Sequence, residues 1–202
     1  MHPDLKYVSE HLLKLGLGIL CQAQRNVLYS SFGYAARIDE GVFGVIQTAQ
    51  AAELIIKAAI SQQHPLLIFS HLPKSNTVSG ELLSIEDIFE NAKTLQYSEL
   101  PEKLWAVTGF KIFDISLYNK FGNLRNTIQH FGVPDKDIRL ESAIYIYNVI
   151  DPLLDHFWND YAVNHVDVME AKDDIFELLA KKNIYARFPE ELRAYAEAAY
   201  KK

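Results

Sequence analysis

The chain has 202 residues and carries 20 lysines and arginines against 26 aspartates and glutamates, which gives a net charge of −6. This acidic balance argues against a protein that binds nucleic acid through a broadly basic surface, so any RNA-binding surface must be local. A single cysteine, Cys21, excludes an intrachain disulfide and disfavours a cysteine-based metal site. With about half of its residues apolar, the chain is long enough to build one domain around a real core.

The start of the chain indicates where the protein resides. Residues 1–6 do not show the basic and then apolar order of a signal peptide. The most apolar early stretch, 12–20, contains Lys14 and is shorter than the ~20 residues that span a bilayer. We therefore expect a cytoplasmic protein that does not insert into a membrane.

Helical periodicity dominates the first third of the chain. Apolar residues recur at helical spacing over 3–25 and more strongly over 39–62, where Asp39 suits the N-cap position. The intervening residues, 26–38, contain serines and a glycine and predict a connection. Residues 73–80 form the most loop-like stretch of the chain.

The remainder also predicts helices. Ser84 and Asp87 form an imperfect capping box that opens a short helix, and no stretch alternates as a strand would. Further helices are expected over 102–117, from about 122 to 131, over 135–162 with a kink or restart at Asp151-Pro152, over 169–182 and over 189–201. The sequence therefore predicts an all-α protein that forms a single domain over 1–202.

One polar constellation stands out, in the stretch GNLRNTIQHFG that begins at Gly122. It contains Arg125, followed by Asn126 and, four positions later, by His130. An arginine can hold a phosphate through its charged fork, and a histidine can move a proton near neutral pH. Asn126 and His130 share a helix face, whereas Arg125 lies ~140° from His130 around the axis. If the helix starts at Gly122, its free N–H groups would also favour a phosphate.

Less specific explanations remain open for the same residues. A histidine on a helix is commonly a surface or boundary residue, and Arg125 could pair with an acidic neighbour.

Two histidine pairs have spacings unlike those of metal ligands on one helix: His64 with His71, and His156 with His165. We therefore expect no metal site. We expect a group of aromatic residues to serve in packing: Tyr145, Tyr147, Phe157, Trp158 and Tyr161. We expect a group of basic residues to form a solvated helix face: Lys181, Lys182, Arg187, Arg193, Lys201 and Lys202.

The Arg125-Asn126-x3-His130 pattern resembles that of the HEPN superfamily of all-α domains. The segment Ala52–Ile60 is similar to an early helix of that family, because Glu53 and Lys57 stand one turn apart. The short 66–72 segment also fits the family's order. The resemblance covers about 39–160, which leaves an N-terminal helix and a C-terminal helical extension, about 161–202, as additions to a HEPN-like helical bundle.

The resemblance implies a homodimer in which two copies of the motif face each other, and a metal-independent endoribonuclease of the toxin or phage-defence kind that uses no cofactor. The RNA's own 2′-OH would attack the adjacent phosphorus. His130 would act as general acid or base, Arg125 would stabilise developing charge, and Asn126 would orient the phosphate or the histidine. Glu53 and Lys57 are secondary candidates, with a surface salt bridge as the alternative.

Other members of the superfamily are not nucleases. They act as binding or assembly modules, or as partners of a nucleotidyltransferase antitoxin. The acidic net charge keeps open a catalytically silent binding or scaffold protein of the same fold. An antitoxin or nucleotidyltransferase partner is therefore a further expectation.

Overall fold

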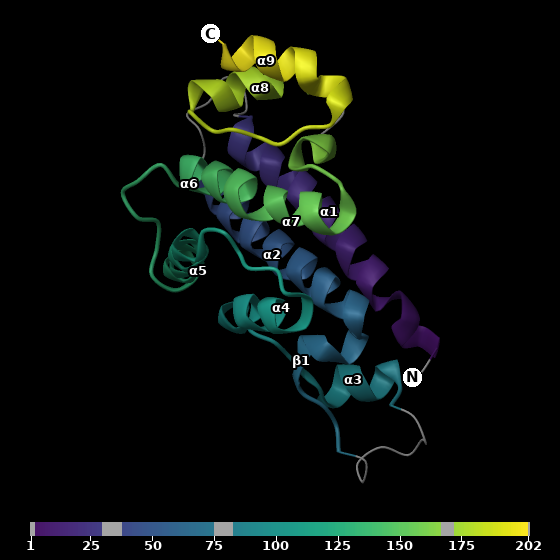
Figure 1. The fold of residues 1–202 in the computed structure, drawn as a ribbon. Helices are drawn as coiled ribbons and strands as arrows, with labels where there is room; N and C mark the ends of the chain where they lie inside the picture. Colours follow the sequence, from purple (N-terminus) through teal and green to yellow (C-terminus); the bar gives the residue numbers. More distant parts are fainter. Residues whose placement is uncertain (1–2, 30–37, 75–82, 167–171, 202) are drawn as a thin grey trace.

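The protein is mostly helical in a computed structural model that describes residues 3–29, 38–74, 83–166 and 172–201 (Figure 1). The helices are α1 (Val8–Leu28), α2 (Ile38–Gln63), α3 (Ile85–Asn91), α4 (Leu100–Thr108), α5 (Ile115–His130), α6 (Ile138–Tyr145), α7 (Asp151–Trp158), α8 (Lys172–Lys181) and α9 (Arg193–Tyr200). Two short strands, β1 (Phe69–His71) and β2 (Lys93–Thr94), pair antiparallel. The all-α class is confirmed, with this small ribbon as the exception that no sequence pattern indicated.

The two longest helices, α1 and α2, pack against each other as an antiparallel pair (Figure 1). Glycines let their backbones approach closely. A Cβ on Gly16 would lie 3.0 Å from Ile55 Cγ1, and one on Gly44 would lie 2.9 Å from Val27 Cγ2. Larger side chains at these two positions would push the helices apart and open the core.

Helix α2 is the centre of the core. It contacts α1, α4, α5, α6 and α7, and its residues Ala51, Ala52, Ile55, Ile56, Ala58, Ala59 and Ile60 are fully buried. Residues Glu40–Gln63 are long and apolar enough to cross a bilayer, but 67% of the most apolar window is buried inside the protein. A core helix has the same composition, so this helix does not by itself indicate a membrane span.

The predicted helix over 102–117 is wrong, because the chain breaks it into two. Helix α4 ends at Thr108, and Gly109 follows with a φ of 78°, a left-handed conformation that glycine adopts without strain. Helix α5 begins at Ile115, where the Asp114 side chain accepts a hydrogen bond from Leu117 N at 2.8 Å. The helix that carries the Arg/His motif therefore starts seven residues before Gly122, not at it.

The predicted long helix over 135–162 is shorter and divided. It starts at Ile138, which Asp137 caps, and ends at Trp158, where Asn159 has a φ of 49°. A π-helical turn over Ile146–Ile150 precedes α7, and Pro152 lies in the first turn of α7. Proline has no N–H to donate to the preceding turn, and at Asp151-Pro152, where a kink or restart was predicted, the backbone stays helical with a π-type hydrogen bond from Asp151 N to Ile146 O.

The other predicted helix boundaries lie closer to those in the structure. Ser84 caps α3 in a complete capping box with Asp87, and the first two helices extend three residues and one residue beyond their predicted C-terminal ends. Most of the predicted connection 26–38 and of the loop 73–80 lies outside the described residues. The predicted helices over 169–182 and 189–201 correspond to α8 and α9, which lie at the end of the molecule opposite α3 and β1 (Figure 1).

The buried carboxylate of Asp151 links the C-terminal extension to the core. Its Oδ1 accepts a hydrogen bond from Ala162 N at 2.7 Å, and its Oδ2 accepts one from Arg187 N at 2.8 Å. Burial raises the pKa of Asp151 to about 7, although these two N–H donors and the charge of Arg187 act in the opposite direction.

This raised pKa predicts a specific pH dependence of stability. Between the ordinary pKa of 3.8 and about 7, the folded state binds a proton that the unfolded state has lost. The free energy of unfolding therefore falls as pH rises through this window and becomes level above it. In urea unfolding, the free energy of unfolding of the wild type should fall by about 3 kcal/mol more than that of Asp151→Asn between pH 5 and pH 8. Parallel pH profiles for the two proteins would show that Asp151 does not titrate in this window.

Candidate functional site

An open pocket of about 640 Å³ lies between α2, the segment after β2, and α5. Its lining comes from three parts of the chain that are distant in sequence: Glu53 from α2, Thr94 at the end of β2 with the connecting residues 95–98, and Asn119, Gly122, Asn123, Arg125 and Asn126 from α5. Three of the five residues predicted for the site, Arg125, Asn126 and Glu53, therefore lie together on one pocket.

Three of the α5 residues that line the pocket lie on one stripe of the helix, and Arg125 lies about 100° around the axis from it. Asn119, Asn123 and Asn126 recur at spacings of four and three, which places them on the same face. His130 lies on this stripe as well, about 6 Å along the axis beyond Asn126. It is exposed at the last position of the helix and does not line this pocket.

Arg125 differs from the other arginines whose ion pairs are described. Arg139, Arg187 and Arg193 each pair with a carboxylate. Arg125 forms no ion pair with any described residue, and its single hydrogen bond is a long one of 3.4 Å from Nη1 to Asn126 Oδ1. Because α5 begins ten residues earlier, no free helix N–H groups assist Arg125, and that part of the sequence argument is wrong. The anion-binding capacity of the pocket therefore rests on the guanidinium.

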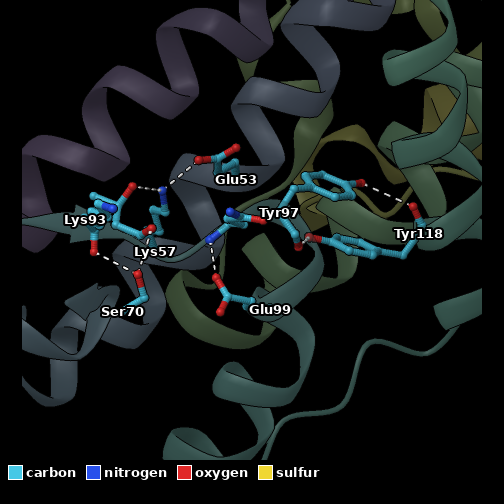
Figure 2. Close-up of polar contacts among 9 residues, drawn as sticks. Glu53, Lys57, Ser70, Lys93, Tyr97, Glu99 and Tyr118 are labelled. Atoms are coloured by element: carbon cyan, nitrogen blue, oxygen red, sulfur yellow. Dashed lines mark hydrogen bonds and ion pairs between the residues drawn. The ribbon is translucent and has the colours of Figure 1, made fainter.

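Glu53, which lines the pocket, forms a salt bridge with Lys57, with 2.7 Å between Lys57 Nζ and Glu53 Oε1 (Figure 2). The Lys57 side chain is 6% exposed and also donates to Thr94 Oγ1 at 3.2 Å. The i,i+4 salt bridge predicted as the alternative is therefore present, but Lys57 is buried in it and joins α2 to β2. Glu53 and Arg125 both line the pocket, so its lining carries one carboxylate, already paired with Lys57, and one guanidinium.

Three tyrosines hold the connecting segment against α5. Tyr97 stacks on Tyr118 with ring centroids 4.3 Å apart, and its hydroxyl lies 2.6 Å from that of Tyr145. The Tyr118 hydroxyl donates to the Tyr97 carbonyl at 2.6 Å (Figure 2). Burial raises the pKa of all three phenols, so they remain protonated and hydrogen-bonded at neutral pH. The pocket wall is therefore fixed before any ligand arrives.

Gly122 allows Tyr97 to lie directly on α5, and its substitution gives a stability prediction. A Cβ at Gly122 would lie 2.7 Å from Tyr97 Cε1, whereas one at Gly18 in α1 would meet nothing within 4 Å. Gly122→Ala should destabilise the protein by about 1–3 kcal/mol, because the ring cannot move without losing its hydrogen bonds. Gly18→Ala should stabilise it by about 0.5–1 kcal/mol. Chemical denaturation of the two variants checks both signs, and a stabilised Gly122→Ala would contradict the packing described here.

The structure adds pocket residues that the sequence prediction missed. Asn119 and Asn123 could have been found from the stripe they share with Asn126 and His130. Thr94 and Tyr97 carried no comparable signal, because only the tertiary fold brings their segment to α5.

The other candidate groups have structural partners. His156 packs on Phe110 and Phe157, and His165 Nε2 lies 2.6 Å from Asp160 Oδ2. Within the described residues, no group of three or more histidine, cysteine, aspartate or glutamate side chains could hold a metal ion. The aromatic group is part of the core or packs against it, and Arg187, Arg193 and Lys201 of the basic group are in salt bridges.

No family model, curated protein or solved structure matches the chain. The HEPN resemblance therefore depends on the motif residues and on the order of the helices alone.

Proposed function

We propose that the protein is a metal-independent endoribonuclease of the HEPN type, with Arg125 and His130 as its central residues. The observation that carries the proposal is the environment of Arg125, whose guanidinium lines an open pocket without a carboxylate partner among the described residues. A buried or half-buried cation normally has an anionic partner, and an RNA phosphate would supply one.

The chemistry needs one proton removed and one added. The RNA 2′-OH loses its proton and its oxygen attacks the adjacent phosphorus, while the bond to the 5′-oxygen of the next nucleotide breaks and that oxygen gains a proton. The products are a 2′,3′-cyclic phosphate and a 5′-OH. In this scheme His130 transfers one of the protons, Arg125 stabilises the charge on the phosphorane oxygens, and Asn126 orients the phosphate.

A homodimer would bring the second motif to the site. Directly after His130, the Phe131 side chain is 90% exposed and Val133 is 45% exposed. Apolar side chains this exposed beside a polar motif favour burial against another chain. A second copy docked there would place its own His130 near the pocket stripe. Two protomers would then supply both the acid and the base.

The experiment that tests this proposal removes the nucleophile from the substrate. Wild-type protein is incubated with an RNA in EDTA, and the strongest cleavage position is mapped. A single 2′-deoxyribose on the 5′ side of that bond should abolish cleavage there and leave cleavage at other positions unchanged. Continued cleavage at the deoxy position would contradict attack by the 2′-OH.

A silent binding module is the second candidate, and two observations favour it. The protein is acidic, and Glu53 places a carboxylate in the same pocket as Arg125. Such a protein would bind RNA or a protein partner without cleaving the RNA in the assay above. A partner antitoxin or nucleotidyltransferase, and a cytoplasmic location, stay predictions.

A further inference from the structure

The pocket face of α5 carries side chains that do nothing for the fold. Asn119 and Asn123 are exposed and line the pocket, and their side chains form no hydrogen bond with any described residue. Asparagine is less favourable in a helix interior than alanine, lysine or glutamate. Residues that weaken a helix without a structural partner indicate a functional face.

Their position relative to Arg125 suggests what they contact. Along the helix axis, Asn119 precedes Arg125 by about 9 Å and Asn123 precedes it by about 3 Å. Around the axis Arg125 lies about 120° and 160° from them, so it is the long arginine side chain that lines the same pocket. The volume of about 640 Å³ lies within the usual range for pockets that bind small molecules. A phosphate held at Arg125 would therefore leave room in the same pocket for the base attached to it.

We propose that Asn119 and Asn123 form a base-binding subsite that reads the nucleotide next to the phosphate held by Arg125. Each side-chain amide offers both a donor and an acceptor, as the edge of an unpaired base requires. The opposite wall carries Thr94 and Ser98, and the tyrosines hold it in place, so the subsite is formed in advance. The inference rests on the proposed function in taking RNA as the ligand, but it concerns binding and not cleavage.

Binding of uncleavable probes tests the subsite independently of catalysis. Fluorescent 2′-fluoro pentanucleotides lack the attacking hydroxyl, and the central position is A, C, G, U or abasic. Wild type should bind at least one of the four base-containing probes about tenfold more tightly than the abasic probe. Asn119→Ala/Asn123→Ala should bind all five within twofold of one another, at the affinity of the abasic probe. Arg125→Ala should weaken all probes alike.

A thermal melt shows that the double variant is folded. Replacing two helical asparagines by alanine should raise its melting temperature by about 3 °C. The control variant is Asn148→Ala, which removes an exposed asparagine outside the pocket and should keep the base preference. Equal binding of base-containing and abasic probes by wild type, no binding of any probe, or a preference retained by the double variant would overturn the subsite. A base preference without cleavage of natural RNA would support the subsite and contradict the nuclease.

Discussion

His130→Ala should reduce metal-independent RNA cleavage by about 10²–10⁴-fold, which is the usual contribution of a general acid or base. His130 is exposed at the end of α5, so its removal should change the free energy of unfolding by less than about 0.5 kcal/mol. The measurement is the single-turnover rate on a labelled RNA in EDTA, together with urea unfolding of the same preparation.

The matched control for this variant is His11→Ala, which removes another exposed helical histidine from α1. It should retain the wild-type rate. A rate for His130→Ala within threefold of wild type would show that His130 is the surface residue that its exposure alone would suggest.

Arg125→Ala should reduce cleavage by about 10²–10³-fold, because it removes the donor that stabilises charge on the phosphorane oxygens. Arg125→Lys should recover only part of this loss, since an ammonium cannot bind two phosphate oxygens with a planar fork. Single-turnover rates for the two variants test both expectations.

Lys120→Ala is the control for charge, because Lys120 is an exposed cation on the same helix and does not line the pocket. Equal losses for Arg125→Ala and Lys120→Ala would indicate a general effect of net charge. Full activity of Arg125→Lys would show that a point charge is sufficient, and the bidentate role would then be wrong.

The helices were predictable where apolar spacing was regular, as in α1 and α2. The break between α4 and α5 was missed, although Gly109 and Asp114 carry its local signals. Residues on both sides of the break are apolar, and Phe110 and Ile112 within it are buried. Periodicity alone therefore continues through this connection, and only the cap residues mark it.

The candidate site was predictable only in part, for a related reason. Arg125, Asn126 and His130 are close in sequence, so their spacing identified them. Glu53 was selected through the family resemblance, and its place beside Arg125 depends on how α2 packs against α5. Tyr97 contributes through stacking and hydrogen bonds with residues 21 and 48 positions away, and no local pattern encodes such contacts.

The most direct test of the central claim is the chemistry of the RNA ends produced by wild type and His130→Ala in EDTA. Both proteins are purified identically, checked for fold and oligomeric state, and incubated with a mixed RNA pool. We expect wild type to produce 2′,3′-cyclic phosphate and 5′-OH ends, and His130→Ala to produce almost none. No cleavage by wild type, or equal cleavage by both proteins, would contradict the account and leave a binding module as the function of this fold.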